Sequence, residues 1–375
     1  MKLIFTLFSF IIFSFSSLCQ EMVKIKIILT TDKNYSDKFY IAGNNDQLGN
    51  WDPSSIQIDK VNDTTYFKEF SFEKGTNLEF KFTRGSWQNE ALSNEGKVLA
   101  NYKVTADTDK ELKYHITIWK DERPIKSEIT GKVEYIRNMK YEGLKGRDVI
   151  VWLPESYEKN LDKKYPVLYV HDAQNAFDPS TSTFGIDWRI DEVTDSLIKN
   201  NIIKEIIIVA INNTSDRFSE YSYSPLGYKY MDFIINTLKP MIDSKYRTLQ
   251  GPENTGVLGS SMGGLISFML AWEHPDVFGL SACFSPAFKI DKLDYTPFVS
   301  KYDGPKKNIK FYIDNGSVGL EDSLQHGVDS MLKLLEEKGY EEGKDLIYRK
   351  FIGEEHSELA WSKRVYIPLE FFFRK

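Results

Sequence analysis

The sequence predicts an all-β sandwich followed by an α/β domain with a mostly parallel central sheet. Short alternating runs of apolar residues, separated by turn residues, fill roughly the first hundred residues after the N-terminal segment. From residue 130 onward, continuous apolar runs alternate with helical patterns, which is typical of a parallel sheet buried on both faces. The length of 375 residues exceeds what one hydrophobic core usually serves, so we expect two domains.

The N-terminal segment 1–19 has the pattern of an export signal. Lys2 supplies a positive charge, residues 3–15 are almost wholly apolar, and residues 17–19 include small side chains. The apolar run is too short to cross a bilayer, so no membrane span is expected. The sequence therefore predicts a signal peptide that is removed near Gln20, and an exported protein that is periplasmic or secreted.

Charge and cysteine content argue against several classes of protein. The formal net charge of −6 argues against nucleic acid as a partner, because proteins that bind it usually carry an excess of positive charge. Once the signal is removed, Cys283 is the one remaining cysteine, so no intramolecular disulfide is expected. It lies in an apolar run and is expected to be a buried core thiol. No cluster of Cys and His has metal-ligand spacing, so the sequence predicts neither a metal site nor an organic cofactor.

Residues 20–122 are predicted to form the sandwich. The runs with strand alternation include 23–27, 39–42, 78–82 and 114–118. No helical period of useful length interrupts them, which favours an all-β domain. Charged, unpatterned residues at 120–130 indicate a linker to the second domain.

Two stretches of the first domain carry a recognisable pattern. Residues 43–53 read GNNDQLGNWDP after a predicted strand, and residues 82–90 read FTRGSWQNE. The first stretch resembles the signature of starch-binding (family 20) carbohydrate-binding modules, and the second partly resembles their second signature. The resemblance implies a glycan as a partner of this domain. Trp51 is expected in the core of the sandwich, because tryptophan is mostly buried in proteins.

Residues 130–375 are predicted to form the α/β domain. Strands are expected near 147–154, 165–170, 205–211, 255–259, 280–284, 308–313 and 346–352. Helical patterns occupy 265–272 and 324–335, and an aromatic-rich helix is expected near the C-terminus. Because ligands of such sheets bind at the carboxyl ends of the strands, the functional residues are expected at that edge.

The turn 259–263 indicates the chemistry of this domain. It reads Gly-Ser-Ser-Met-Gly and matches G-x-S-x-G, the turn that holds a nucleophilic serine between a buried strand and a helix. Such a serine has strained backbone angles, and neighbouring glycines leave room for the strand and the helix to pass closely. An apolar strand precedes the turn and an apolar helix follows it. Ser261 is therefore predicted to be a nucleophile rather than part of an ordinary tight turn.

A serine hydroxyl needs a base to accept its proton, and three histidines follow Ser261. His274 is excluded because the intervening helix places it roughly 20 Å away. His326 lies in a helical pattern and is expected on a solvated face. His356 falls in the loop after the last predicted strand, where the base of such a turn belongs. It is predicted to be the catalytic base rather than a surface histidine.

The acid that holds the imidazole is expected in the loop 314–322, which follows a predicted strand. Asp314 lies at the strand end, where its side chain can instead shape the turn. Glu321 and Asp322 lie at the start of the next helix, where either is also a favourable first-turn charge. Glu321 is chosen as the acid, and Asp314 and Asp322 remain as alternatives.

An oxyanion hole needs two N–H groups directed at developing charge. Met262, directly after the nucleophile, is predicted to supply one. Gln174, in the loop after the strand at 165–170, is predicted to supply the other. His171 and Asp172 stand side by side just before it, but adjacent residues leaving a strand point to opposite sides. We interpret these two as loop-shaping groups rather than as a catalytic pair.

Further segments of the second domain form a pattern in the same order along the chain. They are Leu153-Pro154, Tyr157, 165–169, His171-Asp172, Gln174-Asn175, Phe177-Asp178, Arg217, Glu220-Tyr221, Pro225, the serine turn, 314–316, His356, Glu358 and Ala360-Trp361. Together they resemble a family of α/β hydrolases that includes feruloyl and other carbohydrate esterases, esterase D types, enterochelin esterases and mycolyltransferases. The resemblance spans residues 130–375.

This resemblance implies an α/β-hydrolase fold and serine esterase activity. It also implies that Asp172, Asn175 and Arg217 contribute to substrate binding. Arg217 and Glu220 match one family segment, and they either line the pocket or form a buried ion pair that braces the loop. Where family members commonly have glycine, this chain has Ala173. Alanine tolerates a positive φ poorly, so a slightly altered oxyanion loop is expected.

The main hypothesis is an exported serine esterase acting on a small-molecule or polysaccharide ester. The first domain, residues 20–122, is called the front domain below. Its resemblance to carbohydrate-binding modules favours carbohydrate-linked acyl groups as substrates. A siderophore trilactone esterase, which the same family includes, is the second hypothesis. The third is a glycan-binding protein whose hydrolase domain has lost activity. That hypothesis requires a damaged catalytic set, whereas Ser261 and His356 are both present.

Overall fold

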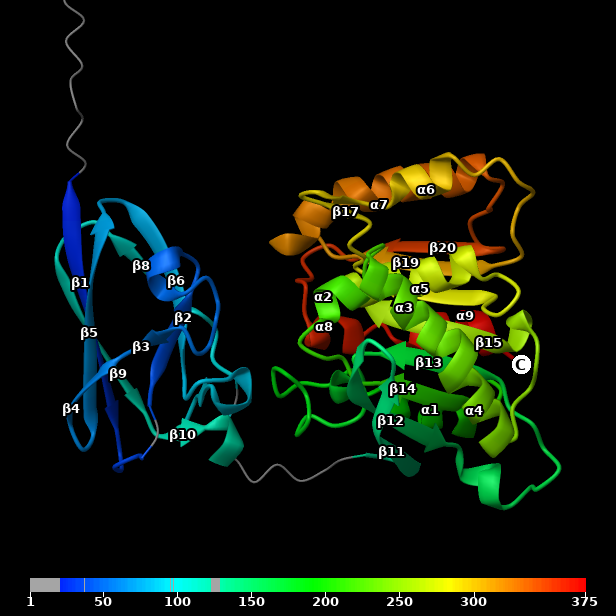
Figure 1. Ribbon diagram of the computed structural model, residues 1–375, viewed down its shortest axis with the longest axis horizontal. Helices are drawn as coiled ribbons and strands as arrows, with labels where there is room; N and C mark the ends of the chain where they lie inside the picture. Colours follow the sequence, from blue (N-terminus) through cyan, green and yellow to red (C-terminus); the bar gives the residue numbers. More distant parts are fainter. Residues whose placement is uncertain (1–20, 37, 95, 97, 123–128) are drawn as a thin grey trace, which may run out of the picture. The chain divides into compact units, whose positions relative to one another are not determined.

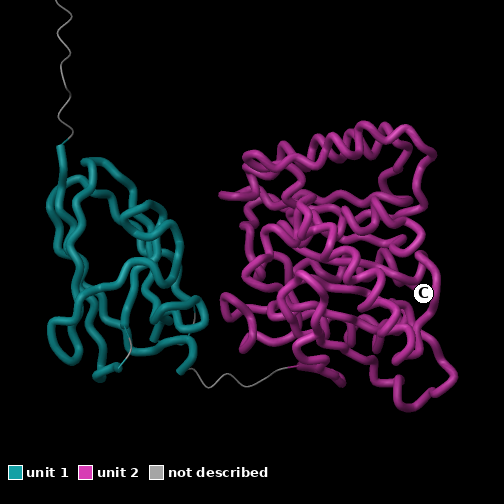
Figure 2. Tube along the Cα trace, viewed as in Figure 1, with its two compact units in different colours: residues 1–124 teal, residues 125–375 magenta. Residues whose placement is uncertain are grey.

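The computed structural model describes residues 21–375 apart from 37, 95, 97 and 123–128. The predicted export signal at 1–19 lies outside the described residues. Contacts within the chain divide it into two compact units, residues 1–124 and residues 125–375 (Figure 2). Each unit is built around its own apolar core.

The first unit is a β-sandwich (Figure 1). Its strands are β1 (Met22–Thr31), β2 (Tyr40–Gly43), β3 (Ile56–Gln57), β4 (Asp59–Asn62), β5 (Thr65–Glu73), β6 (Thr76–Thr83), β7 (Ala91–Leu92), β8 (Tyr102–Ala106), β9 (Lys110–Ile116) and β10 (Ile118–Trp119). One sheet has the order β4-β5-β1-β9 and the other the order β3-β2-β6-β8. Strand β1 is antiparallel to β5 and parallel to β9, and β7 pairs with β10.

Alternation along the strands builds the core of this sandwich. In β1 every second side chain from Val23 to Leu29 is buried, and the intervening ones are more exposed. These side chains belong to the same apolar cluster as Phe80 of β6, in the other sheet. Trp119 is fully buried in this cluster. The expectation that Trp51 lies in the core is wrong, because it is only half-buried and lies in a turn with a φ of 63°.

The second unit is built on an eight-stranded sheet. Its strands are β11 (Lys132–Tyr141), β12 (Leu144–Leu153), β13 (Val167–His171), β14 (Ile207–Ile211), β15 (Thr255–Ser260), β16 (Leu280–Phe284), β19 (Lys310–Asn315) and β20 (Leu346–Lys350). They lie in the order β11-β12-β14-β13-β15-β16-β19-β20. The six strands from β14 to β20 in that order are parallel, and β11 and β12 add antiparallel strands at one edge.

Helices cover both faces of the sheet (Figure 1). They are α1 (Ile190–Lys199), α2 (Arg217–Glu220), α3 (Pro225–Phe233), α4 (Lys239–Lys245), α5 (Met262–Glu273), α6 (Thr296–Ser300), α7 (Leu320–Glu337), α8 (Glu358–Ser362) and α9 (Tyr366–Phe373); a small ribbon pairs β17 (Lys289–Ile290) with β18 (Leu293–Asp294). Alternate residues of β14 beginning at Ile207 share an apolar cluster with α5, and those beginning at Ile208 share a second cluster with α1 and α9. A continuous apolar strand therefore contributes to two cores.

The predicted fold class is confirmed, because an α/β domain with a mostly parallel sheet follows an all-β sandwich. Strand β11 has no counterpart among the predicted strands. It lies at the sheet edge, carries many charged residues and has register shifts after Ile136, so its apolar pattern is weak. In the part of the chain that the structure describes, no helix has the length and apolar character needed to cross a membrane.

Candidate active site

The serine turn lies at the carboxyl edge of the sheet, between β15 and α5. Ser261 has φ 57° and ψ −120°, a strained conformation for a residue with a side chain. A Cβ on Gly259 would lie 2.4 Å from the carbonyl oxygen of Gly263, so glycine is needed for the strand and the helix to pass this closely. These features are those of a nucleophile turn.

His356 comes from the loop after β20. Ser261 and His356 line the same cavity, which has a volume of about 310 Å³. Nδ1 of His356 lies 3.3 Å from Oε1 of Glu321, an ion-pair distance at which the N–H is not aligned for a hydrogen bond. Such contacts are often long in unliganded enzymes and shorten with substrate. The imidazole therefore has access to the cavity and contacts a carboxylate.

The three candidate acids have different surroundings. Glu321, at the start of α7, is fully buried and lies beside His356. Asp314, at the end of β19, is also buried, but its Oδ2 lies 3.0 Å from Nε of Arg364. Asp322 is exposed. Of the three carboxylates, that of Glu321 is the one in contact with the imidazole.

Glu321 reaches back from α7 toward the strand ends because Gly316 leaves room for its side chain. A Cβ on Gly316 would lie 2.8 Å from Cγ of Glu321. The N–H of Gly316 donates to Oε2 at 3.0 Å, and Oγ of Ser285 donates to Oε1 at 2.6 Å. Burial by itself raises the pKa of Glu321, but the interactions with His356, Ser285 and Gly316 outweigh it and hold this pKa below its ordinary value. The carboxyl group is therefore ionised at neutral pH.

The two predicted oxyanion donors both lie near the serine turn. Met262 is the first residue of α5, so its N–H is one of the donors that a helix N-terminus leaves without an intrahelical partner. Gln174 belongs to the short helical turn 173–175 after β13 and lines the cavity. The expectation about Ala173 is wrong, because the positive φ in this loop, 59°, falls on Asp172. An alanine at 173 therefore causes no strain of that kind.

Asp172 and Arg217 form a clamp at the wall of the cavity. Arg217 donates from Nε to Oδ1 of Asp172 at 2.8 Å and from Nη2 to Oδ2 at 2.7 Å. Asn213 donates to Oδ1 at 2.6 Å. Burial raises the pKa of Asp172, but the charge and hydrogen bonds of Arg217 outweigh it and lower this pKa overall. Both carboxylate oxygens are therefore occupied within the protein, and Arg217 is the member of the pair with the more exposed side chain.

Of the two alternatives given for Arg217 and Glu220, the ion pair between them is not formed, because Arg217 lines the cavity and binds Asp172. Glu220 pairs instead with Arg147 of β12, which donates from Nη1 at 3.0 Å and from Nη2 at 2.5 Å. Both side chains are almost completely buried. A buried Arg–Glu pair thus braces this loop, but its arginine comes from β12 and not from α2, which carries Arg217.

Asn175 also lines the cavity. Its Nδ2 donates to Oε1 of Glu358 at 3.2 Å, and its Oδ1 accepts from the N–H of Thr183 at 2.9 Å. These bonds connect α8 with the loop that carries Thr183. Direct contact of Asn175 with a substrate stays a prediction.

His171 is fully buried, and its Nδ1 lies 2.9 Å from the hydroxyl oxygen of Tyr230. Burial lowers the pKa of His171 to about 3, so its ring is neutral at physiological pH. A buried neutral imidazole fits the interpretation of His171 as a residue that shapes the loop.

Sequence reasoning missed several residues that the structure brings to the site. Phe184, Asn213 and Trp361 line the cavity, and Ser285 contacts Glu321. Asn213 follows β14 by two residues, so its place after a strand end was a usable signal. Ser285 directly follows β16 and so offers the same signal, but its partner Glu321 lies 36 positions away and only the structure brings the two together.

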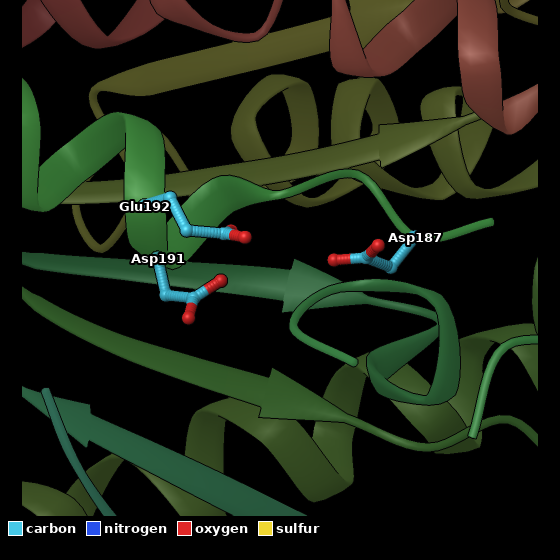
Figure 3. A group of neighbouring side chains, drawn as sticks. All are labelled: Asp187, Asp191 and Glu192. Carbon is cyan, nitrogen blue, oxygen red and sulfur yellow. The ribbon is translucent and has the colours of Figure 1, made fainter. Parts of the chain in front are cut away.

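One group of acidic side chains in the described part of the chain has the spacing of a metal site. Asp187, Asp191 and Glu192 place carboxylate oxygens within 4.8 Å of one another, and Figure 3 shows the three groups facing a common space. Burial raises the pKa of Asp187 to about 6, and burial together with Glu192 raises that of Asp191 to about 8. Carboxyl groups that stay protonated do not repel one another, so these three side chains can lie together without a bound cation.

A strained serine after a central parallel strand, with a histidine from the loop after the last strand of the sheet on the same cavity, defines an α/β hydrolase. Residues 145–357 match the family described as "Putative esterase". The chain belongs to this family and is a carboxylic ester hydrolase. Residues 22–114 match the family described as "Starch binding domain". The resemblances predicted for the two domains are therefore confirmed.

Three known proteins show the extent of the similarity. An endo-1,4-beta-xylanase/feruloyl esterase of Xylanibacter ruminicola is 26% identical over 133 residues, which are 34% of this chain and 18% of that protein. The structure of a ferulic acid esterase matches with 23% identity and a TM-score of 0.54, over 64% of this chain and 98% of that one. The enterobactin esterase from Shigella flexneri, with enterobactin present, matches with 12% identity and a TM-score of 0.55, over 95% and 94%. At these identities the two structures show a shared fold.

Proposed function

We propose that the protein is an exported serine esterase in which Ser261 is the nucleophile, His356 the base and Glu321 the acid. One observation carries the proposal. Ser261, on its strained turn, shares a cavity with His356, and a carboxylate oxygen of Glu321 lies 3.3 Å from Nδ1 of that ring. Export rests on the signal pattern at 1–19, and the match to a starch-binding family supports it.

The proposed reaction has two halves. Oγ of Ser261 attacks the ester carbonyl carbon while Nε2 of His356 takes the hydroxyl proton, and Glu321 stabilises the imidazolium that forms. The tetrahedral intermediate collapses, and His356 returns the proton to the departing alcohol. Water then gives a proton to His356 and attacks the acyl carbon. The second tetrahedral intermediate collapses as His356 returns that proton to Oγ of Ser261, so the carboxylic acid leaves and both residues are regenerated.

The N–H groups of Met262 and Gln174 are proposed to bind the oxyanion. The N-terminus of α5 adds a favourable dipole at the first of these positions. Because the negative charge exists in the transition state and not in the ester, donors at these positions lower the barrier rather than merely binding substrate.

Carbohydrate-linked esters are the proposed substrates. The cavity wall carries polar side chains suited to sugar hydroxyl groups, from Gln174, Asn175, Asn213 and Arg217. Phe184 adds an aromatic surface for an acyl group. The starch-binding match of the front domain and the feruloyl esterase among the relatives support the same class.

Ser261→Ala tests the mechanism. Loss of the nucleophile is expected to lower kcat for p-nitrophenyl acetate by about 10⁴-fold or more. Ser267→Ala is the matched control, because its buried hydroxyl, in the helix that follows Ser261, donates to the carbonyl of Gly263 at 2.7 Å and has no part in the proposed chemistry. Its kcat is expected to stay close to wild type.

Undiminished turnover by S261A contradicts the proposal. A glycan-binding protein without activity would instead show no turnover in the wild type and unchanged starch retention in S261A.

A second candidate is a siderophore trilactone esterase. It is favoured by one observation: the fold of the enterobactin esterase covers 95% of this chain. Comparing kcat/KM of the mature protein for acetylated xylan, feruloyl esters and a catecholate trilactone separates the two candidates. A preference for the trilactone by about tenfold or more, which is a difference of about 1.4 kcal/mol in transition-state binding, would favour the second.

A further inference from the structure

Ser285 lies in a short turn that is bonded to the backbone of the nucleophile. It follows β16, is fully buried and has a φ of 43°. The N–H of Ser261 donates to the carbonyl of Phe284 at 2.8 Å. The N–H of Ala287 donates to the carbonyl of Ser261 at 3.1 Å. Two backbone hydrogen bonds therefore join the turn 284–287 to Ser261.

The same turn holds the carboxylate beside the imidazole. Oγ of Ser285 donates to Oε1 of Glu321 at 2.6 Å, the short distance typical of a hydroxyl bound to a carboxylate. That oxygen is also the one that lies 3.3 Å from Nδ1 of His356. The N–H of Gly316 donates to Oε2 at 3.0 Å. Both carboxylate oxygens of Glu321 are therefore anchored, one of them by Ser285.

The other partners of Ser285 determine where its hydroxyl points. Its Oγ accepts from Nε1 of Trp361 at 3.0 Å and from Nη2 of Arg364 at 3.0 Å. A hydroxyl group has one hydrogen and two acceptor lone pairs. Because both lone pairs are occupied, the hydrogen is left for Glu321, and this gives the hydroxyl a single orientation.

Contacts to Asp314 and the ring of Trp361 hold this arrangement in place. The N–H of Ser285 lies 3.0 Å from the carbonyl oxygen of Asp314 and 3.1 Å from its Oδ1. Oδ2 of Asp314 lies 3.0 Å from Nε of Arg364. The ring of Trp361 packs edge-on against His356, with centroids 4.9 Å apart and planes at 84°. Ser285 thus connects the segments that follow β16, β19 and β20.

We propose that Ser285 is a positioning residue for ester hydrolysis. It holds the carboxylate of Glu321 toward His356 and ties that carboxylate to the turn that is bonded to Ser261. The spacing between the nucleophile and the acid is thereby kept constant. The inference rests on the proposed catalytic roles of Ser261, His356 and Glu321, and Ser285 acts through Glu321 rather than on the substrate.

Ser285→Ala is expected to lower kcat by about 10- to 100-fold, the range expected for one hydrogen bond to a charged group. KM is expected to change little, because Ser285 contacts Glu321 and not the cavity that takes the substrate. The loss of a donor also makes the charged form of Glu321 less stable, so this carboxyl group is protonated at higher pH than in the wild type. The acidic limb of the kcat profile is therefore expected to move to higher pH. A merely structural serine would not produce that shift.

Ser281→Ala is the matched control. Ser281 is buried in β16, the strand that Ser285 directly follows, and its hydroxyl contacts Sγ of Cys283 at 3.4 Å. The same change of side chain there is expected to leave kcat and the pH profile close to wild type. Glu321→Ala and the double variant S285A/E321A complete a cycle. If Ser285 acts through Glu321, S285A is expected to have little effect in the E321A background.

The cycle separates two kinds of failure. If E321A has wild-type kcat, the proposed acid is wrong and the inference about Ser285 falls with it. If E321A loses kcat but S285A keeps both kcat and the acidic limb of the wild type, the positioning role alone is overturned. Should S285A fail to fold, Ser285→Cys keeps the size of the side chain with a weaker donor. Its kcat is then expected between wild type and E321A, and a wild-type value would overturn the proposal.

Discussion

Arg147 and Glu220 form a pair whose side chains are 1% and 0% exposed. Arg147 also lies over the ring of Tyr230, 5.0 Å from its centroid, and Tyr230 contacts His171 at the end of β13. The pair therefore supports the loop after β13, which carries Asp172 and Gln174. A buried pair stabilises a fold little compared with apolar residues, but removing one member leaves a charge without compensation.

Arg147→Met is therefore expected to lower the free energy of unfolding by about 3–5 kcal/mol, because Glu220 is left charged or must take up a proton in the interior. Urea unfolding measures the change. Lys145→Met is the control: Lys145 is also on β12, but its pair with Asp216 is partly exposed, so the expected loss is below about 1 kcal/mol. Equal stability of R147M and wild type would contradict this account.

Helix α1 begins with an acidic cluster in its first turn. Oδ2 of Asp191 accepts from the N–H of Thr130 at 2.6 Å and from its hydroxyl at 3.1 Å, so it ties the start of the second unit to α1. Asp187 and Glu192 face the same space (Figure 3). The stability of this element therefore depends on how many protons the cluster holds.

Stability is expected to fall as pH rises through the window set by this cluster. The pKa of Asp191 in the folded protein is raised to about 8 from an ordinary 3.8, so between these values the folded state holds a proton that the unfolded state has lost. The slope is at most about 1.4 kcal/mol per pH unit, which corresponds to a fall in Tm of about 3–6 °C per unit. Asp191→Asn mimics the protonated side chain and is expected to flatten Tm between pH 6 and 8.

Asp195→Asn, on the same helix but paired with the exposed Lys199, is the control and is expected to keep the wild-type slope. A wild-type Tm that is constant from pH 6 to 8, or a slope unchanged in D191N, would show that Asp191 is ionised in the folded protein.

The whole molecule consists of two units with separate cores. The sandwich has its own cluster of buried apolar side chains, and the esterase unit has a cluster on each face of its sheet. A unit with its own core has the packing needed to fold independently. The proposed catalytic residues all belong to residues 125–375.

A truncated protein of residues 125–375 is therefore expected to keep the kcat/KM of the full chain for a soluble p-nitrophenyl ester. It is expected to lose retention on insoluble starch, if the front domain supplies that binding. Turnover and sedimentation with starch measure the two properties on the same samples. Full-length S261A serves as the control, with retention kept and turnover lost. A folded truncation without activity would show that the esterase unit depends on the sandwich.

The parts of the fold that the sequence predicted are those with strong local patterns. The parallel strands are buried on both faces, so they appear as continuous apolar runs. The edge strand β11 is charged and irregular, and it lacks that pattern. Trp51 was predicted in the core because tryptophan is usually buried, but its place in a turn with positive φ decides its exposure. In the site, Ser261 was found from a turn motif and His356 from its place after a strand.

The sequence by itself determined the two-domain organisation, the fold class, the serine turn and the position of a histidine after the last strand, because each depends on neighbours within a few residues. The tertiary structure decided which of three carboxylates lies beside His356, and that Arg217 binds Asp172 while Glu220 binds Arg147. It also decided that Ser285 holds Glu321. These pairs join residues tens of positions apart, and their contacts exist only where the strands of the sheet bring their ends to one edge.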